Sequence, residues 1–463
     1  MADSWATSGL DLHLQVGRSG VRRSLETALR DAVQTGRLGA GTALPSSRAL
    51  AADLGVARNT VAEAYGQLVA EGWLEARHGS GTWVSGHAQP APRATAPTTP
   101  PQPWTPRYSL LPGRPNVSAF PRGPWAAAAR RALAKAPSDA FDYGDPRGRV
   151  ELREALAGYL SRARGLRVVP DHIVVTSGFT QALALVTAVL RARQATTLAV
   201  EAFGVPLHRR VIERNGVALR HLDVDGLGAR VGMLEREAAV LLTPAHQFPL
   251  GVPLDNTRRR EAIDWAQRTG AFVIEDDYDG EFRFDRQAIG AMQALAPDRV
   301  VYAGTSSKSL SPALRLGWLA VPPELLDEVA EAKALADHGS SVLDQLTLAE
   351  LIVSGEYDRH VRRMRLAYRR RRERLTAALT GGALDARPIG IASGMHLLVE
   401  LPPGTDEPGV IDRARGRGLA IEGLGSYSQP GAARPAALVI GYATPPDHLY
   451  TAALARLCAV LAG

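Results

Sequence analysis

The sequence predicts an α/β protein with a mostly parallel sheet and a small α+β domain at its C-terminal end, preceded by a separate group of short helices. Apolar runs that alternate with helical segments predict the sheet, because strands buried on both faces are continuously apolar. A proline-rich stretch predicts the division, because it suits neither a helix nor a central strand. We expect an N-terminal domain at 1–86, a linker at 87–107 and the α/β domain at 108–463.

Five apolar runs in the long C-terminal region have the length of strands, and each is flanked by a segment with helical spacing. Parallel strands need such helical crossovers between them. Three further runs, at 394–402, 419–425 and 437–443, are expected to build the smaller α+β domain. The five runs of the main sheet cover residues 172–178, 196–202, 239–245, 271–279 and 299–308.

The composition argues against a membrane-spanning or disulfide-bonded protein. Hydrophobic residues make up 45% and charged residues 22% of the chain, which is typical of a globular protein. No apolar run is long enough to cross a bilayer, and the N-terminus lacks the pattern of a signal peptide. The single cysteine, Cys458, cannot form an internal disulfide. We therefore expect a cytoplasmic protein.

The basic residues are almost all arginines, and they are distributed unevenly along the chain. The formal net charge is +7, a weak indication of nucleic-acid binding, yet acids and bases balance within about the first 85 residues. The lysines are only Lys135, Lys308 and Lys333. An amine can lose its proton and become a nucleophile, whereas a guanidinium can hardly do so. A lysine kept in an arginine-rich chain is therefore a candidate for chemistry.

The N-terminal region has the spacing of a helix-turn-helix followed by a hairpin. A first helix is expected over 21–35, with a stripe of apolar residues on one face. A short helix capped by Ser46 or Ser47 ends at Gly55, as a serine N-cap and a glycine stop predict. A second helix then extends from residue 59 or 60 to about 71. In this motif the second helix enters the major groove with its N-terminus first.

The same motif predicts the DNA contacts. Arg58, Asn59 and Thr60 begin the second helix, where they would meet base edges or phosphates. The glycine-rich tip Gly79–Ser80–Gly81 is lean enough to approach the minor groove. The segment LPSSRALAADLGVARNTV, with the later EGWL and GSGTWV, resembles the winged helix of the GntR family. That resemblance implies DNA contacts at Arg48, Arg58, Asn59, Thr60, Ser80 and Gly81. A helical hairpin that binds only protein is the alternative.

Two patches of the C-terminal region fit an aldehyde cofactor. Lys308 follows an apolar strand in a serine-rich turn, where partial burial would supply the neutral amine that a Schiff base needs. Arg315 lies one short loop further and offers donors for a phosphate. Asp276 and Tyr278 follow a buried strand, at the end where open α/β sheets bind ligands. A carboxylate there can keep a pyridine nitrogen protonated.

Two further turns complete the pattern. Gly178, Phe179 and Thr180 lie where a strand passes into a helix, and their amide groups would bind an anion at the helix N-terminus. HQFPLG at 246–251 is a fourth turn at a strand end. Each patch alone is more simply a solvated loop, a polar strand end or a helix cap. Together and in this order they favour a cofactor site.

These patches resemble the fold-type I aminotransferases, and most closely the MocR subgroup, in which a GntR winged helix precedes such a domain. The similarity includes YGDPRGRVELREALAGYL, DQLTLAELI and HVRRMRLAYRRRRERL. It implies pyridoxal 5'-phosphate joined to Lys308, with Asp276 at the pyridine nitrogen and Tyr278 at the ring oxygen. It also implies a phosphate held by Arg315 and the turn at 178–180. Tyr143 is expected to reach the phosphate from the partner subunit, so a homodimer is expected.

The chain departs from the enzymes at positions that bear on catalysis. The segment 201–205 lacks the usual E-x-P-G-aromatic pattern, so the ring-stacking aromatic is either missing or displaced to Phe203. The turn at 248–251 lacks the usual asparagine, and His246 and Gln247 are candidates to replace it. Arg434 is not a clear match for the arginine that binds a substrate carboxylate. No catalytic turnover and no metal are therefore expected.

These departures favour a regulator that senses pyridoxal phosphate or an amine effector, with control of vitamin B6 metabolism as one role. The alternative is a working aminotransferase that carries a DNA-binding domain. A third interpretation is a helical interaction module on an inactive enzyme. The arginine-rich helix at 362–375 is interpreted first as a solvated face whose side chains cover apolar neighbours, with contact to DNA phosphates as a secondary interpretation.

Overall fold

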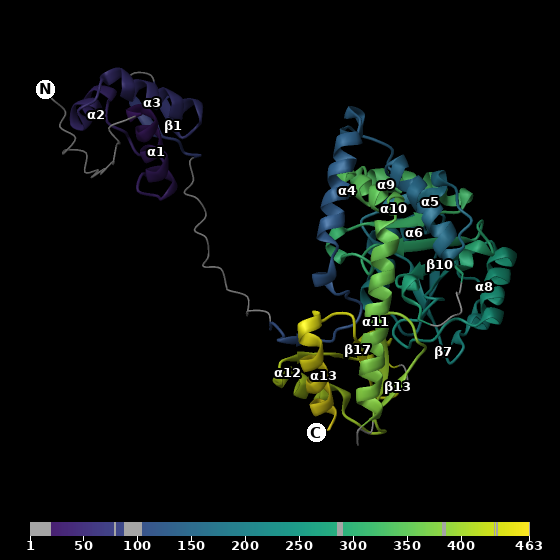
Figure 1. The fold of residues 1–463 in the computed structure, drawn as a ribbon. Helices are drawn as coiled ribbons and strands as arrows, with labels where there is room; N and C mark the ends of the chain where they lie inside the picture. Colours follow the sequence, from purple (N-terminus) through teal and green to yellow (C-terminus); the bar gives the residue numbers. More distant parts are fainter. Residues whose placement is uncertain are drawn as a thin grey trace. The chain divides into compact units, whose positions relative to one another are not determined.

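The computed structural model describes residues 20–77, 80–87, 104–284, 290–381, 386–429, 431 and 434–462. The chain divides into two compact units, Met1–Trp104 and Thr105–Gly463, and Figure 1 shows their helices and strands. Most of the predicted linker at 87–107 lies outside the described residues. No helix in the described ranges has the length and apolar character needed to span a bilayer.

The N-terminal unit is a winged helix-turn-helix. The second helix of the helix-turn-helix motif begins at Arg58, one or two residues before the predicted start. The Ser46 hydroxyl accepts a hydrogen bond from the Ala49 amide at 3.2 Å and so caps the short helix, which ends at Gly55 with φ 66°. The elements are α1 (Val21–Gln34), α2 (Ser47–Leu54), α3 (Arg58–Ala70), β1 (Leu74–Arg77) and β2 (Gly81–Val84), the last two pairing antiparallel.

The C-terminal unit is built on a seven-stranded sheet of order β4-β12-β11-β10-β9-β5-β6. It is mostly parallel, as predicted, but β12 runs antiparallel to both of its neighbours. The five predicted runs form five of its strands, whereas β6 and β12 were not predicted. The strands are β4 (Ile173–Thr176), β5 (Thr197–Glu201), β6 (Ala218–Leu222), β9 (Ala239–Leu242), β10 (Phe272–Asp277), β11 (Val300–Thr305) and β12 (Gly317–Ala320).

Helices cover both faces of this sheet. Trp318 packs with the apolar residues of α5 and α10, whereas the next residue, Leu319, packs with those of α6 and α9. Successive strand residues point to opposite faces, so the two clusters mark the two sides. The helices are α4 (Arg122–Lys135), α5 (Val150–Arg164), α6 (Phe179–Ala192), α7 (Pro206–Arg214), α8 (Asn256–Thr269), α9 (Pro323–Asp337) and α10 (Val342–Val353).

The smaller α+β part has a four-stranded sheet of order β13-β14-β17-β16. The long helix α11 joins it to the main sheet, because Val361 belongs to the core beside α5 whereas Tyr368 belongs to the core beneath the smaller sheet. The elements are α11 (Glu356–Thr380), β13 (Arg387–Ile389), β14 (His396–Glu400), α12 (Glu407–Gly416), β16 (Glu422–Gly423), β17 (Ala437–Gly441) and α13 (Asp447–Leu461). The short strands β3 (Tyr108–Ser109) and β15 (Leu419–Ala420) pair in parallel.

Candidate cofactor site and DNA-binding surface

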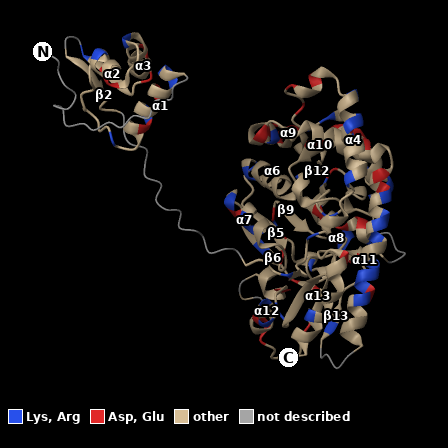
Figure 2. Ribbon diagram, turned by 60° about the vertical axis from the view of Figure 1, so that its left-hand side comes forward, with Lys and Arg blue, Asp and Glu red and all other residues tan. Residues whose placement is uncertain are grey.

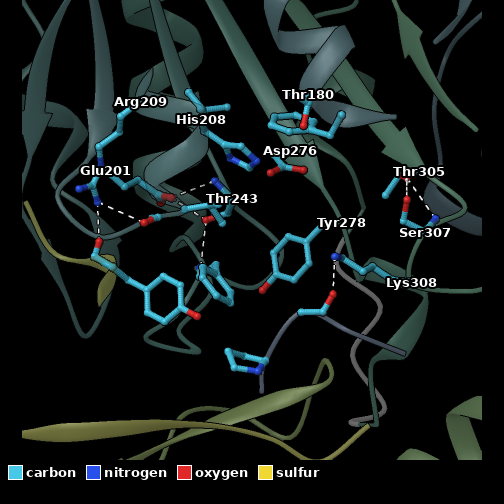
Figure 3. A pocket seen from close by; sticks show the side chains of 18 of the residues that line it. Thr180, Glu201, His208, Arg209, Thr243, Asp276, Tyr278, Thr305, Ser307 and Lys308 are labelled. Atoms are coloured by element: carbon cyan, nitrogen blue, oxygen red, sulfur yellow. Dashed lines mark hydrogen bonds between the residues drawn. The ribbon is translucent and has the colours of Figure 1, made fainter. Parts of the chain in front are cut away.

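A cavity of about 370 Å³ lies at the carboxyl ends of the central parallel strands. Glu201 comes from the end of β5, Asp276 from the end of β10 and Thr305 from the end of β11. Lys308 lines the cavity from the turn after β11, as Figure 3 shows. The carboxyl ends of parallel strands meet at one edge of a sheet, so residues far apart in the sequence converge here.

Lys308 has the environment that favours a neutral amine. Its Nζ donates a hydrogen bond to the carbonyl oxygen of Gly113 at 2.6 Å. Burial lowers the pKa of Lys308, although the carboxylates of Asp276 and Asp279 act in the opposite direction. A lysine with a lowered pKa keeps more of the unprotonated, nucleophilic form near neutral pH.

Asp276 is a buried carboxylate without a hydrogen-bond donor. Its exposed fraction is 5%, and in the described part of the chain no group donates a hydrogen bond to it. Burial raises the pKa of Asp276 well above its usual value, while nearby Lys308 lowers it. A buried carboxylate is costly unless something donates to it. The cavity beside it can admit such a donor, and a protonated pyridine nitrogen has the required chemistry.

Arg315 and Gly178 form an anion-binding corner. Arg315 adopts the left-handed conformation at φ 54°, which is uncommon and costly for a residue other than glycine, and such conformations cluster at functional sites. A Cβ on Gly178 would lie 3.2 Å from a terminal guanidinium nitrogen of Arg315. Gly178 is the N-cap of α6, whose first residues Phe179 and Thr180 line the cavity. A helix N-terminus beside an arginine suits a phosphate.

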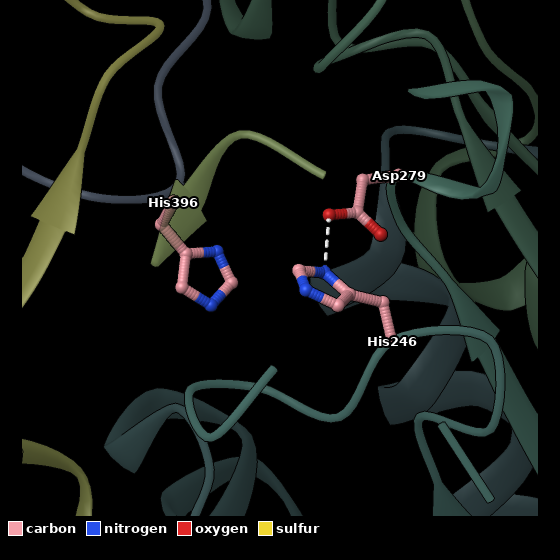
Figure 4. A group of neighbouring side chains, drawn as sticks. All are labelled: His246, Asp279 and His396. Carbon is pink, nitrogen blue, oxygen red and sulfur yellow. Dashed lines mark hydrogen bonds and ion pairs between the residues drawn. The ribbon is translucent and has the colours of Figure 1, made fainter. Parts of the chain in front are cut away.

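The hydroxyl group of Tyr278 is hydrogen-bonded to His246. The Tyr278 hydroxyl donates to the carbonyl oxygen of His246 at 3.0 Å and lies 3.1 Å from its Nδ1. That Nδ1 is also 2.9 Å from Oδ2 of Asp279 (Figure 4). His246 is 2% exposed and does not line the cavity. The role of His246 in place of the asparagine stays a prediction, and in the structure this side chain contacts the cavity residue Tyr278.

A second histidine adjoins this pair. His396 lies with its ring centre 4.9 Å from that of His246, and potential ligand atoms of the two histidines and Asp279 lie within 4.8 Å of one another. The pKa of His396 is lowered far below its usual value by burial and by His246. A Cβ on Gly394 would fall 2.4 Å from Oδ2 of Asp279. Because these side chains are tightly packed and bonded to protein groups, we interpret the cluster as a support for Tyr278.

Several cavity residues were not singled out from the sequence. Burial raises the pKa of Glu201 to about 7, although Thr243 and Gln247 donate to its carboxylate. Burial lowers the pKa of His208 to about 3, helped by Lys308 and Arg209. The His208 side chain faces the cavity, and its neutral ring is flat and aromatic. No motif marks this histidine in the sequence.

Of two aromatic residues considered from the sequence, one lines the cavity and the other does not. Phe203 lines the cavity, so an aromatic ring is present near the unusual segment at 201–205. The His208 ring adds a second one, with its centre 4.6 Å from that of Phe179. Tyr143 is 90% exposed and lines no part of this cavity within its own chain.

The arginine considered for a substrate carboxylate does not line the cavity, whereas two arginines not considered from the sequence do. Arg434 is paired with Glu407 at 2.5 Å and lies outside the cavity. Arg209 lines the cavity, but its guanidinium donates to main-chain carbonyl oxygens, among them those of Ser428 and Gly204. Arg114 lines the cavity rim and is exposed, with no ion pair in the described part of the chain.

The expected DNA contacts lie on the surface of the winged helix-turn-helix. Arg48 is exposed on α2, and Arg58 and Asn59 are exposed in the first turn of α3. Thr60 follows and is half-buried. Ser80 and Gly81 are exposed at the hairpin, while Gly79 lies outside the described residues. The helix-turn-helix geometry thus presents the predicted side chains to solvent, where a groove can reach them.

Comparison with known proteins identifies both units. Residues 21–84 match the model of the bacterial regulatory proteins of the gntR family, and residues 118–413 match that of aminotransferase class I and II. Pyrococcus horikoshii kynurenine aminotransferase has a TM-score of 0.68 at 25% identity, covering 76% of this chain and 90% of that one. The α-aminoadipate aminotransferase LysN of Thermus thermophilus, complexed with a phosphopyridoxyl-leucine, has 0.68 at 26%, covering 77% and 92%.

Relatives that combine both units extend over most of the chain. The Bacillus subtilis HTH-type transcriptional regulator YhdI is 33% identical over 86% of each chain. The probable rhizopine catabolism regulatory protein MocR of Rhizobium meliloti is 32% identical, covering 87% of this chain and 86% of the relative. The pyridoxine biosynthesis regulator PdxR of Corynebacterium glutamicum is also 32% identical, covering 88% and 89%. The chain belongs to the MocR subgroup of the GntR family of transcription regulators, with a winged helix-turn-helix followed by an aminotransferase-like domain.

Proposed function

We propose that this regulator is a cytoplasmic homodimer that binds pyridoxal 5'-phosphate in the cavity and two DNA half-sites through its winged helices, and that occupancy of the cavity changes its hold on DNA. The observation that carries the proposal is the set of complementary groups around one cavity. Among the described residues no group donates to the Asp276 carboxylate and no acid pairs with Arg315, and burial lowers the pKa of Lys308. Pyridoxal phosphate offers a partner for all three.

In this proposal the residues divide by the part of the cofactor they bind. The bound cofactor supplies an aldehyde carbon that joins reversibly to amines, and Lys308 provides the amine of the protein. Asp276 keeps a proton on the pyridine nitrogen. Tyr278 lies against His246, and on binding it would turn its hydroxyl proton from the carbonyl oxygen of His246 to the ring oxygen. Arg315 holds the phosphate together with the turn formed by Gly178, Phe179 and Thr180.

The DNA contacts are proposed by the same residue-by-residue reasoning. Arg48, Arg58, Asn59 and Thr60 would contact base edges and phosphates in the major groove. Ser80 and Gly81 would approach the minor groove. Their exposure supports this assignment. A two-fold symmetric protein binds two half-sites separated by whole turns of the duplex, so a paired footprint is expected.

A dimer is supported by apolar side chains left exposed on one chain. Phe141 is 55% exposed, Tyr143 is 90% exposed and Leu343 is 48% exposed. The Tyr143 ring lies beside His338, with the ring centres 5.8 Å apart. Exposed aromatic and aliphatic side chains of this kind are typical of subunit interfaces. In the dimer, Tyr143 is proposed to reach the phosphate of the partner's site.

Two effectors fit the cavity. Pyridoxal phosphate itself is favoured because Arg434, the arginine considered for a substrate carboxylate, is bound to Glu407 outside the cavity. This would suit the control of vitamin B6 synthesis, as in the name of the relative PdxR. An amine that carries an acidic group is the second candidate, and the exposed Arg114 at the cavity rim favours it. In either case the domain senses a ligand and does not turn over amino acids.

The test is footprinting of the DNA upstream of the regulator's own gene with cofactor-free and cofactor-loaded protein. A pair of half-sites whose protection changes with the cofactor alone would support pyridoxal phosphate as the signal. Protection that responds only when an amine is added to loaded protein would support the second effector. Steady turnover of an amino donor and a keto acid, without any protection, would contradict the proposal and favour an aminotransferase.

A further inference from the structure

One helix carries most of the net charge of this chain. Helix α11, Glu356–Thr380, contains nine arginines against three acidic residues, a net charge of +6, and the whole chain has +7. Residues 1–86, which include the winged helix-turn-helix, contain eight arginines and no lysine against eight acidic residues, and so have no net charge. The region expected to contact DNA is therefore neutral, and the positive charge lies further along the chain.

The arginines of α11 are concentrated on its solvent-facing side. Met364, Tyr368 and Leu375 lie on the buried side and belong to one hydrophobic core. Positions between them, at the helical spacing of the opposite face, are exposed arginines. Figure 2 shows these basic residues as a band along the helix. The exposed arginines are Arg359, Arg362, Arg363, Arg369, Arg370 and Arg374.

Only part of this face is neutralised by acids. Arg369 pairs with Glu373 at 2.9 Å, and Arg359 at the start of the helix pairs with a glutamate of the same turn. Arg362 and Arg370 form no ion pair or hydrogen bond with any described residue. Arg374 donates to a neutral threonine hydroxyl at 2.7 Å. Within the described ranges, at least three guanidinium groups on this face therefore have no carboxylate partner.

The length of this arginine-rich face can be compared with the spacing of phosphates along a DNA duplex. Arg374 follows Arg362 by twelve positions, which span about 18 Å because an α-helix rises about 1.5 Å per residue. One DNA strand carries a phosphate about every 3.4 Å of duplex axis, so roughly five phosphates of one strand would lie along this face. The apolar side of α11 is buried in the core, which argues against a membrane surface, since a membrane-bound helix inserts its apolar side into the lipid.

We propose that the exposed face of α11 binds the phosphate backbone of double-stranded DNA flanking the half-sites. The inference rests on the proposed function in one respect: the winged helices are proposed to hold the duplex, at a half-site or on other sequence, beside which α11 makes its contacts. The contacts are independent of base sequence. They add electrostatic attraction to that of the winged helix-turn-helix region, whose net charge is zero, and they let the ligand-binding domain itself hold the DNA.

The test compares salt dependence on short and long duplexes. The triple variant Arg362→Gln/Arg370→Gln/Arg374→Gln removes three charges, and glutamine has a helix propensity close to that of arginine. Binding constants are measured against salt for a duplex limited to the footprint and for one extended by roughly two turns, about 21 base pairs, on each side. Each phosphate contact contributes about 0.9 to the slope of log K against log salt. We expect the variant to lower the slope on the long duplex by up to about 2.7 and to leave the short duplex unchanged.

The control is a second triple variant, Arg191→Gln/Arg210→Gln/Arg214→Gln, which removes three exposed charges from α6 and α7. It should leave both slopes unchanged. An equal loss of slope in the control, or no loss in the α11 variant on the long duplex, would overturn the proposal. So would a variant that keeps its DNA slope but loses binding to vesicles of phosphatidylserine and phosphatidylcholine.

The two proposals can fail separately. Because the α11 contacts are to phosphates, a long duplex of random sequence should show the same difference between the wild type and the α11 variant. That difference without any footprint on the regulator's own upstream region would leave this inference standing and count against the proposed operator. A footprint on the upstream region, with equal salt slopes for the wild type and the α11 variant, would support the proposed operator and count against this inference. An unchanged circular dichroism spectrum and cofactor absorption band confirm that the α11 variant is folded.

Discussion

Replacing Asp276 with asparagine should have opposite effects on the cofactor-free protein and on cofactor binding. Without ligand, no described residue donates to the buried carboxylate, and burial raises its pKa well above the usual value. An amide of the same shape carries no charge to desolvate. An unsatisfied buried polar group costs about 1–3 kcal/mol, a cost that the amide keeps, but a charged group costs more, and this additional cost is removed. We therefore expect Asp276→Asn to raise the free energy of unfolding of the cofactor-free protein by at least about 1 kcal/mol at pH 8.

The same change should weaken cofactor binding. A hydrogen bond to a charged group contributes about 1.5–3 kcal/mol, and about 1.4 kcal/mol corresponds to a factor of ten in affinity. The dissociation constant for pyridoxal phosphate should therefore rise by roughly 10- to 150-fold. Urea unfolding measures the first effect, and titration of the cofactor absorption band measures the second.

Asp279→Asn provides the matched control. Asp279 is also a buried aspartate, with an exposed fraction of 1%, but it is bonded to His246 at 2.9 Å. Removing its charge weakens a hydrogen bond that already exists, so the cofactor-free protein should become less stable. The reasoning about Asp276 would be refuted if Asp276→Asn also destabilised the cofactor-free protein, or if it bound the cofactor with unchanged affinity.

Three further changes test other parts of the cavity. Lys308→Ala should abolish the absorption band of lysine-bound cofactor and leave the circular dichroism spectrum unchanged, and a band that survived reduction and denaturation would contradict the assignment of this lysine. Gly178→Ala should weaken binding of inorganic phosphate and cofactor alike by roughly tenfold, because φ 94° strains an alanine and its Cβ would press on Arg315; equal affinities for wild type and variant would argue against the phosphate corner. The pKa of Glu201 is raised from 4.5 to about 7, so the folded state binds more protons than the unfolded state between these values, and stability falls as the pH rises through this window. Glu201→Gln should make the unfolding free energy, measured by urea titration from pH 4 to pH 8, less dependent on pH than in the wild type, and an unchanged dependence would show that this carboxyl does not titrate as its burial implies.

The sequence was sufficient for features that depend on neighbouring residues. The serine cap at Ser46, the stop at Gly55 and the buried apolar run of β10 are local patterns, and the structure has each of them. The order of strand, turn and Lys308 also placed the lysine in the cavity, because the carboxyl end of a parallel strand faces the ligand edge of its sheet. The same reasoning gave the mostly parallel sheet, although β12, which is antiparallel, has no local signal of its direction.

The tertiary structure decided which distant side chains meet. His246 is hydrogen-bonded to Tyr278, and Arg434 is bound to Glu407 outside the cavity. Neither result can be obtained from spacing along the chain, because the partners lie 27 or more residues apart and the packing of separate elements brings them together. The lack of a donor at Asp276 is likewise a property of the assembled cavity, since burial and bonding depend on every element around a group. The sequence by itself thus determined the elements and the kind of chemistry, and the tertiary structure determined which groups are left free for a ligand.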